Sequence, residues 1–174
     1  MKLSTIAVAA ALVLPAASLQ AETINDAQIA AIVVTANQVD IDAGELAKKA
    51  ASNGEVRKFA ERMVVDHTGV NKAAAELAGK LTLSPEENDT SRALKSGGEQ
   101  NLAKLRGLEG EAFDKAYVDH EVAYHAQVLD AIDKTLIPNA KNAELKALIV
   151  KVRPAIAAHL EHSKHLQSQL NGKK

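Results

Sequence analysis

The stretch EVRKFAERMVVDHTGVNKAAAELAGKL, residues 55–81, decides the fold class. Apolar residues recur in it every three or four positions, which is the period of one face of an α-helix. One polar residue, His67, interrupts this face in the middle. The spacing is close to a heptad and predicts a helix that packs at the shallow angle of a helical bundle. The apolar positions are Val56, Phe59, Met63, Val70, Ala74, Leu77 and Leu81.

The same period continues on the N-terminal side of this stretch. It predicts a first helix over residues 26–51, in which Asn25 and Gln28 form a capping box. Ser52 and Glu55 have the spacing of a second capping box, which would start the helix of residues 55–81. So short a connection requires the two helices to be antiparallel.

Three further helices are expected on the C-terminal side. One begins at Ser84–Glu87, breaks or bends at Gly97–Gly98 and stops near Gly107. The next covers residues 111–136 and precedes a turn at Pro138 and Asn139. The last covers residues 141–170, and Pro154 is expected to kink it rather than end it. The predicted fold is therefore all-α, a four-helix bundle with an additional broken helix.

The first residues have the pattern of a secretory signal peptide. Met1-Lys2 gives a positive start, and a short apolar run to Leu19 follows it. Cleavage after Ala21 is expected, which separates a signal peptide (1–21) from a single bundle domain (22–174). The run is too short and too interrupted by proline to predict a membrane span. We therefore expect an exported protein of the periplasm, either free or associated with the outer membrane, and not an integral membrane protein.

The composition excludes several classes of function. The chain has 174 residues, of which 47% are hydrophobic and only 2% aromatic, so its core must consist of Ala, Leu, Val and Ile. It has no Cys, which excludes disulfides, a thiolate nucleophile and a covalent haem anchor. The 21 basic and 22 acidic side chains are interspersed, and without a basic stripe or aromatic platforms nucleic acid is not an expected partner.

Three of the six histidines interrupt apolar faces on three different helices: His67, His125 and His159. Glu121 precedes His125 by one helical turn and can point the same way. Asp40, at the edge of the first helix's inner face, lies about as far from the Ser52 turn as His67. Imidazoles and carboxylates that meet inside a bundle typically bind Zn, Cu, Fe or Mn. These five residues are the predicted metal ligands.

The expected levels of His125 and His159 along the bundle do not match as well as those of Asp40 and His67. Counted from a turn at Pro138, His159 lies further out than His125, nearer the level of Glu121, unless the turn or the Pro154 kink shifts the register.

His162 and His165 follow His159 at intervals of three, which allows either a surface metal clasp or, as we favour, solvated histidines near a helix end. His120 is expected to be exposed or at the rim. Asp66 is expected to point away from His67, as a solvated or salt-bridged acid.

Two alternatives use the same residues differently. The core histidines can be purely structural, with Asp40 or Glu121 as their hydrogen-bonding partners. A haem held between Met63 or His67 and a C-terminal histidine fits a bundle, although the scarcity of aromatic residues argues against it.

The Glu-x-x-His motif of di-iron bundles is absent, because the residues three places after Glu61, Glu121 and Glu161 are Val64, Tyr124 and Lys164. No catalytic motif is present, so the sequence does not indicate an enzyme.

Three segments together resemble a known family: Arg62–Thr68 (RMVVDHT), Phe113–Tyr117 (FDKAY) running on to His125, and Pro154–Leu160 (PAIAAHL). They are similar to the family called domain of unknown function 4142, over essentially the whole mature chain. The resemblance implies an exported bacterial protein of the ferritin-like superfamily, with no established activity. The matching motif positions are Asp66, His67, Phe113, Asp114, Tyr117, His125 and His159. Asp40 and Asp42 stand where longer acids are expected, which weakens any carboxylate bridge from that helix.

The favoured hypothesis is a periplasmic bundle that binds a transition metal or a small ligand at the buried His and carboxylate residues, in an envelope stress response. A non-catalytic envelope interaction protein with structural histidines is the alternative. A ferroxidase-like or haem-binding bundle is the third hypothesis.

Overall fold

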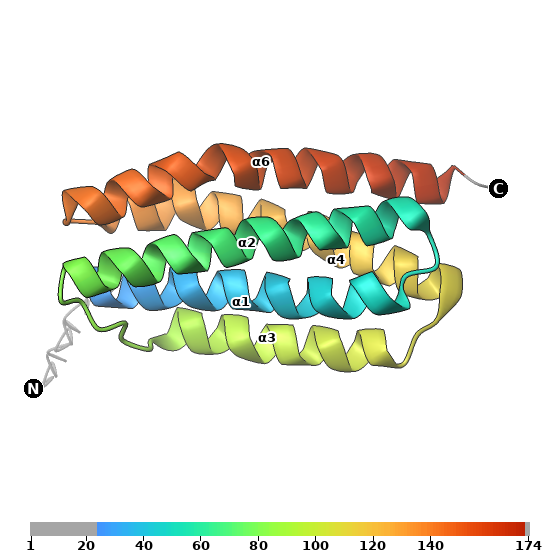
Figure 1. The fold of residues 1–174 in the computed structure, drawn as a ribbon, viewed down its shortest axis with the longest axis horizontal. Coiled ribbons are helices and arrows are strands. Elements are labelled where there is room, and N and C mark those ends of the chain that lie inside the picture. The colour runs from blue at the N-terminus through green and yellow to red at the C-terminus, as the bar shows by residue number, and fades with distance from the viewer. Residues whose placement is uncertain (1–23, 173–174) are drawn as a thin grey trace, which may run out of the picture.

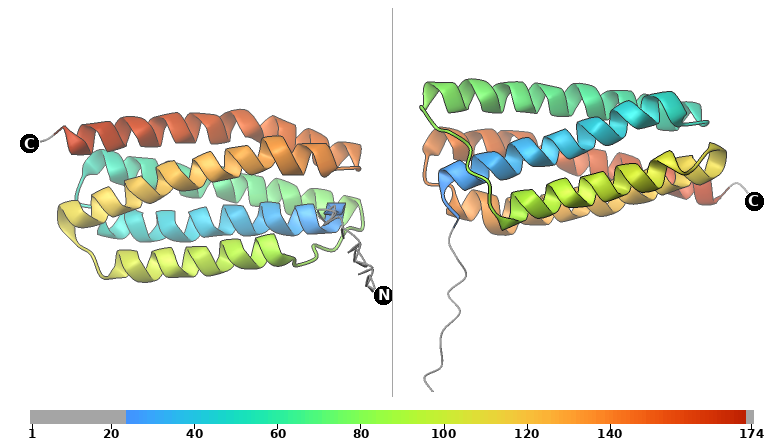
Figure 2. Two further views of the ribbon diagram at one scale, coloured as in Figure 1. Left: turned by 180° about the vertical axis from the view of Figure 1, so that it is seen from behind. Right: turned by 90° about the horizontal axis from the view of Figure 1, so that it is seen from below.

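The computed structural model describes residues 24–172, which form a bundle of long helices (Figure 1). Helices α1 (Asp26–Ala50), α2 (Gly54–Lys80), α4 (Gly110–Ala131) and α6 (Ala143–Asn171) make up the bundle. Helix α3 (Asp89–Arg106) packs on α1 and contacts α4 from outside (Figure 2). A π-helical turn, η1 (Ile132–Leu136), and a short helix, α5 (Ile137–Asn139), continue from α4. The all-α prediction is confirmed.

The predicted signal peptide and the prediction that no helix spans a membrane concern different parts of the chain. The predicted signal peptide, residues 1–21, lies outside the described residues. Within residues 24–172, no helix combines the length and the apolarity needed to cross a membrane.

The hairpin of α1 and α2 forms as the sequence predicts, with one change at the turn. The capping box of α1 is present, because Asn25 Oδ1 accepts from the Gln28 amide and Gln28 Oε1 accepts from the Asn25 amide. The predicted Ser52 cap of α2 is wrong. Asn53 is the N-cap and accepts from the Glu55 amide at 2.8 Å, whereas Ser52 is bonded to α4. The turn between α1 and α2 is therefore held both by the Asn53 cap of α2 and by the hydrogen bond from Ser52 to Asp114 of α4.

The predictions for α3 are wrong at its start and in its middle. The helix begins after Asn88, whose side chain forms a capping box with Ser91, so the segment at Ser84 precedes the helix. The pair Gly97–Gly98 does not break it. A Cβ at Gly98 would lie 2.7 Å from Val39 Cγ2, so this glycine allows α3 to approach α1 closely. Packing therefore outweighs the low helix propensity of glycine here.

The connection of α4 to α6 also differs from the prediction. The chain stays helical past Pro138, through η1 and α5, and turns at residues 140–142. His125 and His159 are nearly equidistant from this turn, which removes the mismatch expected from a turn at Pro138. Helix α6 runs through Pro154 without ending, as predicted.

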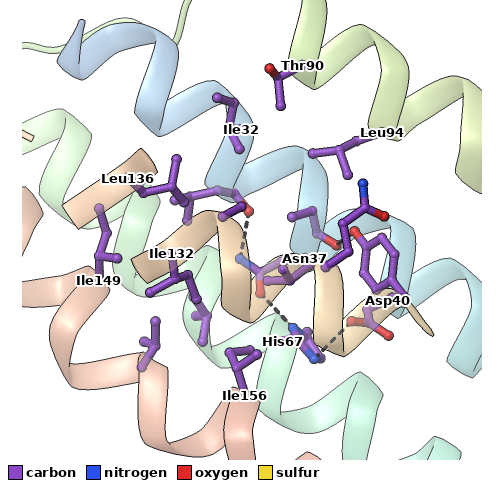
Figure 3. A pocket seen from close by; sticks show the side chains of 18 of the residues that line it. Ile32, Asn37, Asp40, His67, Thr90, Leu94, Ile132, Leu136, Ile149 and Ile156 are labelled. Carbon is purple, nitrogen blue, oxygen red and sulfur yellow. Dashed lines mark hydrogen bonds and ion pairs between the residues drawn. The ribbon is translucent and has the colours of Figure 1, made fainter. Parts of the chain in front are cut away.

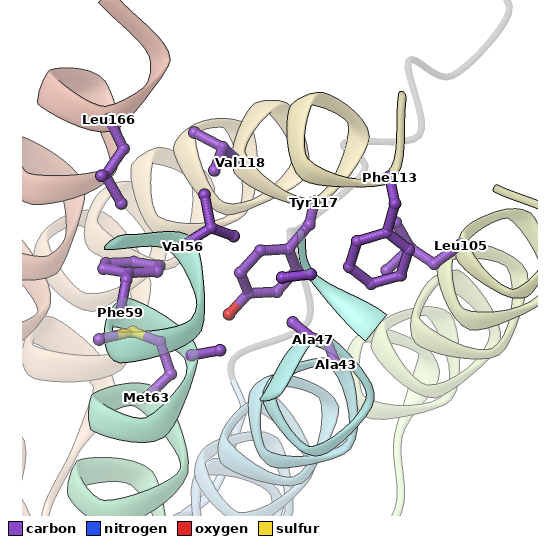
Figure 4. Close-up of a cluster of buried hydrophobic side chains, with 12 residues drawn as sticks. Ala43, Ala47, Val56, Phe59, Met63, Leu105, Phe113, Tyr117, Val118 and Leu166 are labelled. Carbon is purple, nitrogen blue, oxygen red and sulfur yellow. The ribbon is translucent and has the colours of Figure 1, made fainter. Parts of the chain in front are cut away.

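Two separate apolar cores lie along the bundle. The turn-side core, next to the α1–α2 turn, contains Phe59, Met63, Leu105, Phe113 and Tyr117 (Figure 4). The far core contains Ile29, Ile32, Ile132, Leu136, Leu145, Ile149 and Ile156. The buried histidines lie between the two cores, where α1, α2, α4 and α6 converge.

Candidate metal centre

Three imidazole rings meet at the middle of the bundle. His67 of α2, His125 of α4 and His159 of α6 are only 3%, 0% and 2% exposed. Their ring centroids lie 5.3 to 5.7 Å apart in all three pairs. One ring nitrogen from each lies within 4.8 Å of the others. The predicted convergence of these residues is confirmed.

One nitrogen of His67 is held by a residue that sequence reasoning missed. Asn37 of α1 donates through Nδ2 to the Val33 carbonyl at 2.8 Å, so its Oδ1 must accept. That oxygen lies 2.6 Å from His67 Nδ1, which therefore carries the proton (Figure 3). The other nitrogen, Nε2, is left with a free lone pair.

The same assignment holds for His125. Its Nδ1 lies 3.0 Å from the backbone carbonyl of Glu121, an acceptor, and so donates to it. The Glu121 side chain lies on the same side, with Oε2 3.4 Å from Nδ1, as the one-turn spacing predicts. His125 Nε2 is again left with a free lone pair.

His159 is oriented by Asp66, across the helix pair α2 and α6. Its Nε2 lies 2.9 Å from Asp66 Oδ2, so Nδ1 carries the free lone pair. Asp66 is also paired with Arg62 at 3.2 Å, and the prediction of a salt-bridged acid is confirmed. Its contact with His159 was not predicted, because it depends on how α2 and α6 pack.

Two of the three free nitrogens lie beside a carboxylate. Asp40 Oδ2 lies 3.2 Å from His67 Nε2 and 3.6 Å from His125 Nε2, and the predicted proximity of Asp40 and His67 is confirmed. Within residues 24–172, none of the nitrogens His67 Nε2, His125 Nε2 and His159 Nδ1 has a hydrogen-bonding partner. Lone pairs that face a carboxylate oxygen repel it. A tetrahedral ion with bonds of about 2.0–2.1 Å holds its ligands about 3.3 Å apart, close to these separations.

Two buried carboxyl groups adjoin the imidazoles. Asp40 is 2% exposed and Glu121 fully buried, and one ligand atom from each lies within 4.8 Å of the other and of His125. Asp40 Oδ1 and both Glu121 carboxyl oxygens lack a partner in the described part of the chain. Unpaired buried carboxylates are costly, and a cation among them offsets that cost.

The burial of these groups sets their protonation. Burial lowers the pKa of His67 to about 4 and also lowers the pKa of His125 and His159. The imidazoles are therefore neutral at pH 7, as metal ligands must be. Burial raises the pKa of Asp40, and burial together with the charge of Asp40 raises that of Glu121. Without an ion, burial therefore favours the protonated form in this pair of carboxyl groups.

A family model matches residues 11–166, most of the chain. The chain belongs to the family described as a domain of unknown function (DUF4142). The resemblance seen in the sequence is thereby confirmed, whereas its link to the ferritin-like superfamily stays a prediction. No curated protein and no solved structure matches this DUF4142 chain.

The motif positions noted for the DUF4142 resemblance fall into two groups. Asp66, His67, His125 and His159 belong to the histidine centre. The second group, Phe113, Asp114 and Tyr117, lies at the other end of α4, beside the α1–α2 turn. Asp114 accepts there from the Ser52 and Asn53 amides at 2.9 and 2.8 Å and from the Ser52 hydroxyl. The motif thus combines a candidate centre with a structural clamp.

The remaining histidines do not join the centre. His162 and His165 are exposed, whereas His159 is buried, so the three do not form the surface clasp considered from their spacing. His162 and His165 are solvated, which is the alternative that the sequence favours. His120 is half-buried at the rim and stacks on Tyr124 at 5.5 Å between ring centroids.

Proposed function

We propose that this protein binds one divalent transition-metal ion through His67 Nε2, His125 Nε2, His159 Nδ1 and Asp40. One observation carries the proposal. Each imidazole has one nitrogen fixed by another group and a second nitrogen that is buried without a partner among residues 24–172, and one ring nitrogen from each histidine lies within 4.8 Å of the others. Fixing the remote nitrogen is how proteins orient metal-bound histidines.

The donor set favours particular ions. Three neutral imidazoles and one carboxylate suit Zn²⁺, Cu²⁺, Fe²⁺ or Mn²⁺ better than Mg²⁺ or Ca²⁺, which prefer oxygen donors. Glu121 lies beside Asp40 and His125 and supplies an additional oxygen.

The alternative of purely structural histidines is less well supported. In that case Asp40 or Glu121 would accept hydrogen bonds from the rings, yet the ring protons point to Asn37, to the Glu121 backbone and to Asp66. The carboxyl oxygens facing the rings would then remain unpaired. Haem binding is disfavoured too, because Met63 is packed within the turn-side core.

We further propose that the protein works in the cell envelope. The proposal rests on the signal-peptide pattern at Met1–Ala21 and the absence of cysteine. A metal-binding bundle in the periplasm would suit a role in the envelope stress response, as metal buffer or sensor. The bound metal is the first property to establish.

Metal analysis of untagged protein tests the proposed centre. We expect about one ion per chain to survive dialysis, and added Zn²⁺ to raise Tm by mass action. His67→Ala and His159→Ala should abolish both effects. His165→Ala is the matched control, because His165 is exposed on the same helix as His159. Metal-free protein whose Tm does not respond to Zn²⁺, Cu²⁺, Mn²⁺ or Fe²⁺ would refute the proposal.

A further inference from the structure

An apolar cavity of about 90 Å³ adjoins the metal centre on the side of the far core. Asp40 and His67 line one end of it, and α1, α2, α3, α4 and α6 contribute its walls (Figure 3). The cavity therefore ends at two of the proposed ligands.

Away from that end, the polar wall residues are either engaged in hydrogen bonds or lie at the exposed rim, as Thr90 and Gln127 do. The Asn37 amide is engaged by His67 and Val33, and the Tyr124 hydroxyl donates to the Ala36 carbonyl at 2.9 Å. Most other wall residues are aliphatic, among them Ile32, Leu94, Ile132, Leu136, Ile149 and Ile156. A buried water needs two to four polar partners, so the aliphatic part of the cavity is dry and suits a neutral, apolar occupant.

The size of the cavity limits the occupant further. A cavity of about 150 Å³ lined by aliphatic and aromatic groups holds benzene or xenon. The smaller volume here fits an occupant of a few heavy atoms, such as a diatomic gas or a short hydrocarbon.

An irregular stretch of backbone and two small side chains form part of the cavity walls. Ile132 and Leu136, both wall residues, begin and end the π-helical turn η1, which interrupts the regular spacing of α4. Ala36 and Ala131 add only methyl groups to the walls. Single π-helical turns inside α-helices occur frequently at functional sites.

A second hollow, at the surface between α3 and α4, adjoins the cavity. It shares four lining residues with the inner cavity: Thr90, Leu94, Tyr124 and Gln127. Thr90 and Gln127 are exposed, whereas Tyr124 is buried. A third hollow, between α2 and α6, also adjoins the cavity and shares five lining residues with it: His67, Val70, Leu148, Val152 and Ile156. The cavity thus adjoins surface hollows on two sides of the bundle.

We propose that this cavity binds a small neutral apolar molecule, a diatomic gas or a short hydrocarbon, and brings it to the metal ion. The bound molecule lies beside Asp40 and His67, which line one end of the cavity. The part of this inference that concerns the metal rests on the proposed function.

Xenon is the probe for the cavity in metal-free protein. Xenon should shift the methyl NMR signals of Ile32, Ile132 and Ile149 in a saturable way. Ala131→Leu fills the cavity and should remove these shifts, whereas Ala123→Leu, exposed on the same helix, should leave them unchanged. No saturable shift in the native protein, or equal shifts in the Ala131→Leu protein, overturns the inference whether or not a metal binds.

A second measurement tests the proximity of xenon to the metal. Paramagnetic Co²⁺ bound at the centre should accelerate the nuclear relaxation of xenon several-fold, and Ala131→Leu should remove that acceleration. Co²⁺ that binds stoichiometrically without this effect overturns the inference and leaves the metal site standing. If Co²⁺ does not bind while the methyl shifts persist, the proposed function fails and the cavity remains.

Discussion

Two buried acidic sites in this bundle have opposite environments. Asp114, near the α1–α2 turn, is 1% exposed, and its carboxylate accepts from the Ser52 and Asn53 amides and from the Ser52 hydroxyl. Asp40 and Glu121, at the histidine centre, are as deeply buried, yet three of their four carboxyl oxygens lack a hydrogen-bonding partner in the described part of the chain.

The difference separates a structural carboxylate from a functional one. A carboxylate surrounded by donors stabilises the fold, because those donors replace its lost hydration. A carboxylate that faces lone pairs destabilises the fold unless a cation joins it. Burial and residue type alone do not distinguish the two sites; the positions of the protons do.

The largest expected effect is a loss of folding stability when Asp114, the carboxylate surrounded by hydrogen-bond donors, is removed. Asp114→Ala removes the acceptor for two amides and one hydroxyl, and hydrogen bonds to a charged group contribute about 1.5–3 kcal/mol each, so unfolding free energy should fall by at least about 3 kcal/mol. Urea unfolding measures this change. Zn²⁺ binding by the folded variant should be unchanged. Asp130→Ala, an exposed acid paired with Lys134, is the control and should cost about 0.5 kcal/mol or less.

The second prediction concerns Asp40 and is the reverse of the first: the substitution should weaken metal binding and leave the stability of the metal-free protein intact. Asp40→Asn removes an unpaired buried charge, so the metal-free variant should be at least as stable as the native protein. Its Zn²⁺ affinity should fall about 100-fold, which corresponds to about 2.7 kcal/mol. Calorimetry of Zn²⁺ binding and urea unfolding in a chelator measure the two quantities. A variant that binds Zn²⁺ normally and is destabilised would show that Asp40 is structural, like Asp114.

The sequence predicts the helices and the inward histidines, because apolar periodicity reports which face of a helix is buried. It does not predict the partners that fix the imidazole tautomers. Asn37 and Asp66 acquire that role only through the packing of α1 on α2 and of α2 on α6. Gly98 is misread as a helix breaker because its contact with Val39 lies far away in sequence. The turn η1 has no signal in the apolar pattern, so the sequence alone does not give the register of His125 relative to His159.

The third prediction concerns the fixing of His159. Asp66→Asn weakens the acceptor that holds the His159 ring, and losing such a partner typically lowers metal affinity 10- to 100-fold, so we expect about tenfold weaker Zn²⁺ binding. Asp42→Asn is the matched control, because Asp42 is exposed on α1 and contacts only Gln38 among the hydrogen bonds of the described side chains. Equal affinities in the two variants would mean that Asp66 serves only its salt bridge with Arg62.

The smallest effect is a change in the pH dependence of metal-free protein. Burial and the charge of Asp40 raise the pKa of Glu121 in the folded protein above its ordinary value of 4.5, which the unfolded chain retains. The stability that this proton contributes is fully present below that ordinary value and is lost as pH rises towards the folded pKa. Glu121→Gln does not titrate, so its stability relative to the native protein should rise from about pH 5 to pH 7. Urea unfolding in a chelator at several pH values measures this difference. Parallel stability curves for the two proteins would show that Glu121 is already ionised and paired in the folded state, and the contrast between Glu121 and Asp114 would then disappear.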